Sequence, residues 1–208
     1  MSAIETEIIN KSPPKPLVSL WKRFINDIFS LWNVDKEEIY SFMEQANNHH
    51  PTVKFTAEVS ETETAFLDTC NYKGERFKKE SILDVRTHLK PTETFQYTYF
   101  SSCHPPGVKK GFIKSEALRL LRTNSSEKMF EEKITNFKRR LRMRGYRNKV
   151  TDKHLSEVKH HERMSALQKQ NKNAQENTTI RDRISPLSTE PTKNHHAQMV
   201  SYRKPTVA

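Results

Sequence analysis

The sequence predicts an α+β fold: a small antiparallel sheet with one covering helix, then a helical thumb-like bundle and a disordered basic tail. Strand-like apolar runs fill the first part of the chain, whereas helical spacing prevails after Pro91. Residues 17–146 hold 33 of the 45 Leu, Ile, Val and Phe residues, and residues 147–208 hold only 9. That last part has too little apolar surface to offset the entropy of ordering it. We therefore expect four segments: a disordered entry (1–16), a sheet segment (17–92), a helical segment (93–146) and a polar, mostly disordered tail (147–208).

The sheet is predicted to begin with a hairpin. Two apolar runs, residues 20–25 and 28–32, flank Asn26 and Asp27, which are polar turn formers and would occupy its tip. Strands that are apolar on both faces need cover on both, so we expect a helix to pack against this hairpin.

The covering helix is predicted over residues 35–49. Asp35 and Glu38 have the spacing of a capping box, and Pro51 follows the helix. The helix carries an apolar stripe at i, i+3, i+4 and i+7, formed by Ile39, Phe42, Met43 and Ala46. Residues 53–59 alternate as a half-buried strand does, and residues 64–72 and 82–89 are predicted as two further strands.

Helices are predicted after the break His104-Pro105-Pro106-Gly107. A short helix over residues 114–123 is followed by a longer one that Ser125 or Ser126 caps and Gly145 ends. The longer helix has an apolar stripe of Phe130, Ile134, Phe137 and Leu141. Because the turn between the two helices is tight, their spacing resembles a helix-turn-helix or compact tri-helical unit. Weak periodicity predicts one more solvated helix over residues 154–170, with disorder beyond.

Positive charge is concentrated in the helical segment. The chain has a formal net charge of +11, and residues 107–149 contain 14 Lys and Arg against 4 Glu. Positive charge concentrated in so short a segment is typical of proteins that bind a polyanion, either nucleic acid or an anionic membrane surface. A solvated helix face would also explain it. The residues that could contact phosphates are Lys109, Lys110, Lys114, Arg119, Arg122, Lys138, Arg139, Arg140, Arg142 and Arg144.

Several functional classes are excluded. The sequence has no apolar run long enough to cross a bilayer, no secretory signal at residues 1–16 and no glycine-rich phosphate loop. Cys70 and Cys103 form neither a disulfide framework nor a zinc motif. We expect an intracellular protein, compatible with a nuclear location, whose partner is nucleic acid rather than a membrane or a small-molecule substrate.

Residues 21–32, with the tetrapeptide Phe24-Ile25-Asn26-Asp27, resemble the aromatic-x-Asp-Asp hairpin in reverse transcriptases of Penelope-like and related animal retroelements. Further blocks resemble that family in the same order, at residues 50–56, 64–68, 90–94, 101–105, 109–111 and 117–119. The resemblance implies the last part of the palm and the thumb of an RNA-directed DNA polymerase. In that family the helical segment would clamp the template–primer duplex.

The tip departs from the family pattern in a way that affects catalysis. Asn26 replaces the first family aspartate, and Asp27 matches the second, which would be a catalytic residue and a ligand of Mg²⁺. Asn is neutral, and the 16 residues before residue 17 leave no room for the family's upstream aspartate. One carboxylate would remain where the mechanism uses about three, so we expect no bound magnesium and no polymerisation by this chain alone.

We therefore interpret the chain as a truncated retroelement reverse transcriptase that binds an RNA–DNA hybrid or duplex DNA. The alternative is a non-enzymatic helix-turn-helix DNA-binding protein, and a third interpretation is a remnant with no selected role. If the upstream palm strands are missing, the hairpin should have an open edge and an exposed apolar face.

Overall fold

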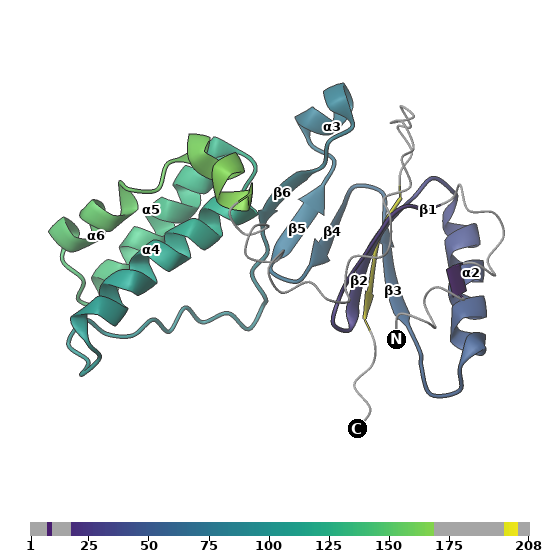
Figure 1. Ribbon diagram of the computed structural model, residues 1–208, viewed down its shortest axis with the longest axis horizontal. Helices are drawn as coiled ribbons and strands as arrows, with labels where there is room; N and C mark the ends of the chain where they lie inside the picture. The colour runs from purple at the N-terminus through teal and green to yellow at the C-terminus, as the bar shows by residue number, and fades with distance from the viewer. Residues whose placement is uncertain (1–7, 10–17, 169–197, 204–208) are drawn as a thin grey trace. The chain divides into compact units, whose positions relative to one another are not determined.

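The computed structural model describes residues 8–9, 18–168 and 198–203 (Figure 1). The fold is α+β, as predicted. The chain divides into two compact units: unit 1 consists of residues 1–84 and 192–208, and unit 2 of residues 85–191. The sequence placed this boundary after residue 92. It lies earlier because Val85 and Thr87 bond to the turn between two helices of unit 2.

The main sheet of unit 1 has the strand order β1-β2-β7-β3. Its strands are β1 (Val18–Phe24), β2 (Asp27–Trp32), β3 (Thr56–Ser60) and β7 (Gln198–Arg203). β7 pairs antiparallel with both β2 and β3. The predicted disorder is therefore wrong for residues 198–203. β7 pairs with the β2 side of the hairpin, whereas β1 is the edge strand of this sheet among the described residues. Met199 and Val200 are fully buried, an apolar pair that the average composition of the tail conceals.

The predicted hairpin forms, but its tip is shifted by one residue. Asp27 is the first residue of β2 and pairs with Phe24, so Ile25 and Asn26 make the turn. Ile25 has φ 55°, a left-handed conformation that β-branched residues seldom adopt.

A second hairpin repeats this arrangement. The predicted strand over residues 64–72 is two strands, β4 (Glu63–Phe66) and β5 (Thr69–Tyr72), which pair antiparallel. The chain reverses at Leu67, which has φ 55°. The only turn former at this tip is Asp68, and one aspartate beside Leu67 was too weak a signal to divide the predicted strand.

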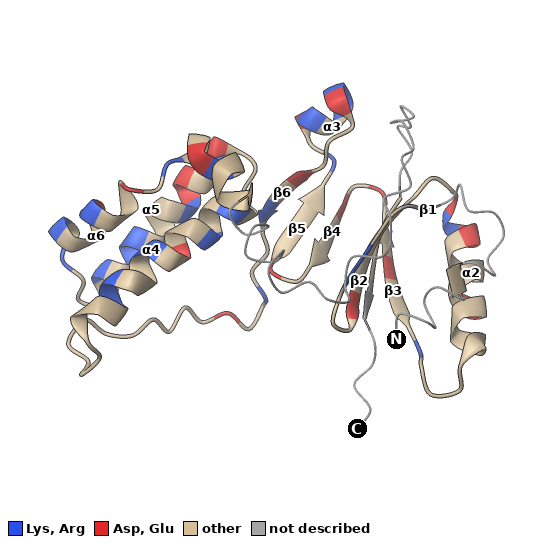
Figure 2. Ribbon diagram, viewed as in Figure 1, with Lys and Arg blue, Asp and Glu red and all other residues tan. Residues whose placement is uncertain are grey.

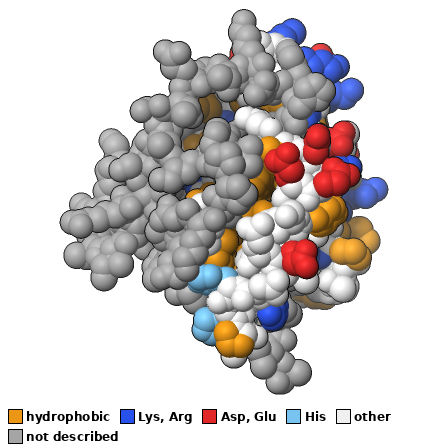
Figure 3. Space-filling view, turned by 90° about the vertical axis from the view of Figure 1, so that its right-hand side faces the viewer, with side chains coloured by type: hydrophobic (Ala, Val, Ile, Leu, Met, Phe, Trp, Pro, Cys, Tyr) orange, Lys and Arg blue, Asp and Glu red, His pale blue; other side chains and the backbone are white. Residues whose placement is uncertain are grey.

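Helix α2 (Lys36–His49) covers one face of the main sheet and buries the predicted stripe of Ile39, Phe42, Met43 and Ala46. These side chains share a core with Ile28, Trp32, Phe55 and Val200. Asp35 is at the N-cap position but makes no side-chain capping hydrogen bond, so the predicted capping box is wrong. Figure 3 views the protein from the side on which α2 lies in Figure 1, and several acidic side chains are close together among its coloured residues.

A short helix, α3 (Glu75–Glu80), precedes β6 (Asp84–Thr87), the only strand within the predicted span 82–89. Asp84 accepts a hydrogen bond from Arg76 Nε at 2.6 Å. Asp84 also explains Gly74, because a Cβ at that position would lie 2.2 Å from Asp84 Oδ2. Six residues of helix are too few to show a periodic pattern in sequence.

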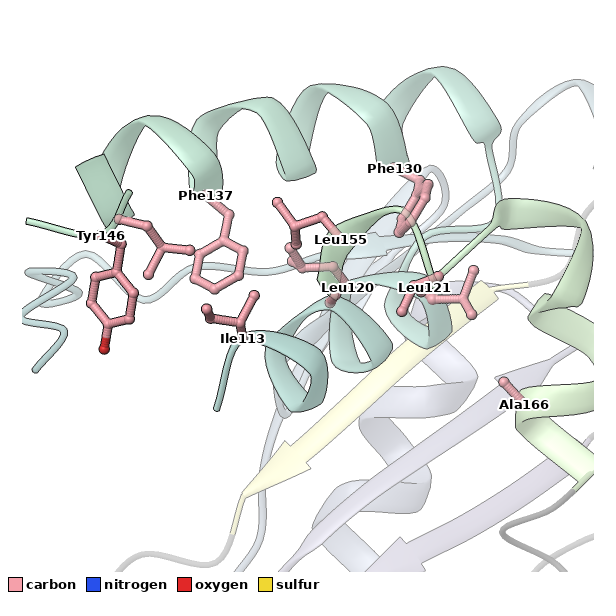
Figure 4. Packing of buried hydrophobic residues seen from close by; sticks show 11 residues of the cluster. Ile113, Leu120, Leu121, Phe130, Phe137, Tyr146, Leu155 and Ala166 are labelled. Atoms are coloured by element: carbon pink, nitrogen blue, oxygen red, sulfur yellow. The ribbon is translucent and has the colours of Figure 1, made fainter. Parts of the chain in front are cut away.

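Unit 2 is built around α4 (Pro106–Thr123), α5 (Glu127–Met143) and α6 (Asn148–Leu155), followed by a 3₁₀ turn, His160–Glu162. α4 begins earlier than predicted because Pro106 stands in the first helical turn, where a missing N–H costs nothing. Figure 4 shows Phe130 and Phe137 of α5 pointing toward Ile113, Leu120 and Leu121 of α4.

The predicted tail joins this core in part. Leu155, Val158 and Ala166 are buried among the helices, so residues 148–166 belong to unit 2 and are not a disordered extension. A few apolar residues are enough to order this segment because they pack against the apolar surface that α4 and α5 already form. None of the helices in the described part of the chain is long and apolar enough to cross a membrane.

Candidate nucleic-acid interface

The basic residues of α4 and α5 meet at one end of unit 2. The Phe100 backbone N–H donates to the Arg144 carbonyl at 2.9 Å, and Lys109 Nζ donates to the Phe100 carbonyl at 2.6 Å. These bonds bring the start of α4 and the end of α5 together. Residues 138–149 contain seven Lys and Arg and no acid. In the ribbon of Figure 2, the Lys and Arg positions of α4, α5 and α6 are blue. We call this end, with residues 109–114 and 138–149, the basic end.

Four side chains of the basic end are exposed and have no hydrogen bond or ion pair within the described part of the chain: Lys110, Arg139, Arg147 and Lys149. Arg142 is also exposed, and its Nε donates to Asn148 Oδ1 at 2.6 Å. Lys110, Arg139 and Arg142 were predicted, whereas Arg147 and Lys149 were missed. The absence of acids across residues 138–149 was the signal that could have found them.

Three predicted residues are paired with carboxylates. Lys114 Nζ lies 2.8 Å from Glu157 Oε2, and Lys138 Nζ lies 2.5 Å from Asp152 Oδ1. Arg119 donates to both carboxylate oxygens of Glu116, at 2.8 and 2.9 Å. The hydrogen bond and the positive charge of the Lys114 ammonium group lower the pKa of the Glu157 carboxyl. A phosphate would have to compete with these carboxylates, so the three bases are weaker candidates than the sequence indicated.

Three more predicted residues hold an extended segment, residues 95–102, against the helices. The Arg140 guanidinium lies 3.2 Å from the centre of the Phe95 ring, and that of Arg144 lies 4.6 Å from the centre of the Tyr99 ring. Lys109 Nζ donates to the carbonyls of Phe100 and Ser102. These contacts are cation–π and hydrogen-bonding interactions within the protein. The sequence concealed these contacts because the partners lie up to 45 residues apart in the chain.

Tyr97 anchors the same segment in the core. Its ring packs against those of Phe112 and Phe137, with centroids 5.2 and 5.4 Å away. Burial raises the pKa of Tyr97, and the nearby Glu116 carboxylate raises it further, so the phenol stays neutral. Arg122, the remaining predicted base, is half-buried on α4, and its carbonyl accepts a hydrogen bond from Arg163.

The turn between α4 and α5 is fixed by a fully buried asparagine. Asn124 Nδ2 donates to the Leu120 carbonyl and to Thr87 Oγ1, both at 2.8 Å, and its Oδ1 accepts from the Thr87 backbone N–H at 3.2 Å. A buried amide is stable only when such partners are present. The turn is therefore held to β6 by side-chain and backbone groups together.

Two neighbours strengthen the same connection. Ser125 N–H donates to the Val85 carbonyl at 2.8 Å, and Ser125 Oγ accepts from the Val85 N–H at 3.0 Å. From the other side, His160 Nε2 bonds the Asn124 carbonyl at 3.3 Å, and its ring packs on Phe130. Ser126 is the N-cap residue of α5, but its side chain makes no capping bond. The turn is a rigid junction that joins helices of fixed relative position.

Two helices joined by so short a turn, with α6 packed across them, form a compact tri-helical unit of the predicted kind. Residues 96–156 match the family model of the animal helix-turn-helix domain. Neither the curated proteins nor the solved structures contain a match to the chain. The matched helix-turn-helix region covers α4, α5 and α6, and it includes the basic end.

The helix-turn-helix region depends on residues outside its matched span. Val85 and Thr87 precede it and hold its turn, while Val158 and Ala166 follow it and complete its core. The natural structural module is therefore residues 85–168. A shorter piece limited to the match would lack Thr87, so Asn124 would lose both of the hydrogen bonds that join it to that residue.

The hairpin tip carries the residue that the sequence predicted as a catalytic and magnesium-binding carboxylate. Asn26 is exposed and Asp27 is half-buried at the start of β2. Within the described residues, no three His, Cys, Asp or Glu side chains come together in a way that could hold a metal ion. The family match does not extend to this hairpin.

Proposed function

We propose that this protein binds nucleic acid through the basic end of its helix-turn-helix region. The observation that carries the proposal is a set of exposed cations that have no partner among the described residues, Lys110, Arg139, Arg147 and Lys149, together with the exposed Arg142. Cations already paired within a protein gain little from a phosphate, whereas unpaired ones release counterions from the polyanion when they bind. The family match supports the same proposal, since helix-turn-helix units commonly place a helix on DNA.

Phosphate contact is favoured over base recognition. The charged exposed side chains of the basic end are all Arg and Lys, and Met143 is exposed beside them at 76% relative accessibility. Asn148 is the exposed amide of this end, and its Oδ1 already accepts a hydrogen bond from Arg142 Nε. Arg140 and Arg144, which could form bidentate contacts with guanine, are instead stacked on Phe95 and Tyr99. We therefore expect binding with little dependence on nucleotide sequence.

The triple variant Arg139→Ala, Arg147→Ala, Lys149→Ala tests the proposal. We expect its affinity for a fluorescent 20-base-pair duplex to fall at least about tenfold, as measured by anisotropy with the full chain. If all three residues contact phosphates, the slope of log K against log salt should also decrease by about 2.7 for B-form DNA.

The matched control is Lys78→Ala, Lys79→Ala, Lys90→Ala, which removes the same charge from exposed residues that are not members of the basic end. This control should change the affinity less than twofold. If both triple variants weaken binding equally, only net charge matters and the assignment to the basic end is wrong. A wild-type affinity that does not depend on salt would contradict nucleic-acid binding through phosphates altogether.

The finer proposal is that the chain derives from a retroelement reverse transcriptase, in which unit 2 would be the thumb that grips the template–primer duplex. The resemblance of residues 21–32 supports this, as does the formation of their hairpin at the predicted place. Equal affinity for RNA–DNA hybrids and duplex DNA, without a preferred site, would favour this origin. A defined duplex site bound at least about 100-fold more tightly would favour the helix-turn-helix DNA-binding protein instead.

We predict that the chain alone does not extend a primer. Asp27 supplies one carboxylate at the tip, and Asn26 is neutral where the family has an aspartate, so a cation would find one negative charge fewer than in the family. Incorporation of labelled nucleotide on a primed RNA template with Mg²⁺ should therefore equal that of the variant Asp27→Asn. Template-dependent incorporation that Asp27→Asn abolishes would overturn this prediction.

A further inference from the structure

Strand β7 occupies an interior position although it comes from the far end of the described chain. It pairs with β2 from Asp27–Arg203 to Trp32–Gln198, and with β3 from Thr56–Arg203 to Ser60–Met199. β2 and β3 are each bonded to β7 and are separated by it in the strand order. Without β7, both would present a row of unpaired N–H and C=O groups to a slot one strand wide.

The slot also has side-chain specificity. Val200 is fully buried and belongs to the core under α2, whereas Met199, also fully buried, points to the opposite face of the sheet. On that opposite face, Thr64 Oγ1 of β4 donates to Ser201 Oγ at 3.4 Å. The slot therefore takes an extended segment with a small apolar residue on one face and an apolar–polar pair on the other.

The connection to β7 does not determine which copy of the chain supplies the strand. Residues 169–197 separate β7 from the last described residue of unit 2. A segment of 29 residues can span up to about 100 Å when extended. A tether of this length permits residues 198–203 to reach the slot of the same chain or that of a neighbouring chain.

We infer that the slot between β2 and β3 is an exchangeable strand-binding site, and that residues 198–203 of a second copy of this chain can occupy it. In the resulting dimer each copy donates its last strand to the sheet of the other. The second copy is favoured over a foreign peptide because its strand has the same register partners and fills the same core position as β7 does within one chain. The contacts are identical in the two forms, so only the tether decides between them.

Protein concentration should set the balance. A tether of 29 residues places its own strand at an effective concentration on the order of a millimolar. The single chain therefore prevails at micromolar concentration, and exchange becomes visible at several hundred micromolar or after joint refolding of two copies. This site lies in unit 1, so its test is independent of the nucleic-acid proposal for unit 2.

Disulfide trapping across the β3–β7 register tests the exchange with the full chain. Glu58 and Ser201 are directly paired residues. Antiparallel partners have Cα atoms about 4.5–5.5 Å apart, which suits a disulfide. All variants carry Cys103→Ser, because Cys103 is exposed, whereas Cys70 is buried and stays. One chain carries Glu58→Cys and a second carries Ser201→Cys; the two are refolded together and oxidised mildly.

We expect a covalent heterodimer on a non-reducing gel, in a yield that rises with total protein concentration. Adding Val200→Asp to the chain with Ser201→Cys should reduce that yield at least about tenfold, because the donated strand then carries a charge into the core. The out-of-register pair Thr62→Cys with Ser201→Cys is the matched control and should give no more than background, since Thr62 lies beyond the β3–β7 pairing.

Two outcomes would overturn the inference. If the single chain with both Glu58→Cys and Ser201→Cys forms no internal disulfide, β7 does not occupy the slot. If that internal disulfide forms readily but the mixed chains yield no heterodimer above the Thr62→Cys control after joint refolding at 500 µM or so, the slot accepts only the strand of its own chain.

Discussion

Asn124→Ala is expected to destabilise unit 2 by about 3 kcal/mol. The substitution removes the three hydrogen bonds that join the α4–α5 turn to Leu120 and Thr87, and it leaves the Thr87 N–H buried without its acceptor. A buried donor that loses its partner costs about 1–3 kcal/mol, and a small cavity adds to this. Urea unfolding followed by circular dichroism at 222 nm measures the effect, because most of the described helix belongs to unit 2.

Asn148→Ala is the matched control for this prediction. Asn148 is exposed and accepts a hydrogen bond only at the surface, from Arg142, so its replacement should cost less than about 0.5 kcal/mol. Equal effects of the two substitutions would show that the turn is not the rigid junction described above. If Asn124→Ala also lowers the affinity for DNA beyond what partial unfolding explains, the turn positions the basic end.

Val200→Asp is expected to unfold unit 1 while unit 2 remains folded. The substitution would place a carboxylate where the Val200 side chain is fully buried, in the core that also contains Ile28 and Phe55. Such a charge has no partner there, so we expect a loss of more than about 4 kcal/mol in the stability of unit 1. The two tryptophans of the chain, Trp21 and Trp32, both pack in this unit and report its unfolding by fluorescence.

The control is the same substitution at an exposed position, Val108→Asp, at which the side chain is 56% exposed. It should leave the tryptophan emission unchanged and shift the unfolding midpoint only slightly. If the tryptophan emission of the Val200→Asp variant equals that of the wild type, unit 1 is stable without β7. A simultaneous loss of helical signal larger than the share of α2 and α3, which belong to unit 1, would mean that the two units do not unfold independently.

The sequence predicted those elements whose pattern is local and strong. The stripe of α2 and that of α5 were correct because each buries four or fewer residues at regular spacing against one surface. The turn at Ile25 and the reversal at Leu67 were misplaced or missed because both residues have an unusual φ that no local pattern indicates. β7 was missed because two buried residues, Met199 and Val200, do not raise the average hydrophobicity of a polar segment.

The candidate site was predicted in its location but only partly in its members. A local excess of positive charge identified α4 and α5, since net charge can be counted in sequence. Which cations are available depends on partners distant in sequence, such as Glu157 for Lys114 and Phe95 for Arg140. Sequence spacing cannot reveal such pairs. Arg147 and Lys149, in contrast, could have been predicted, because the stretch without acidic residues continues past Gly145 to residue 149.

The position of β7 has a consequence for the order in which this chain can acquire its structure during synthesis. Everything that unit 2 needs, from Val85 to Ala166, leaves the ribosome before Gln198 does. Unit 2 can therefore complete its folding cotranslationally, whereas the α2-covered sheet has to wait with β2 and β3 unjoined until the last strand has been translated. Nascent chains stalled before residue 198 should consequently recruit chaperones through the first unit and not through the second.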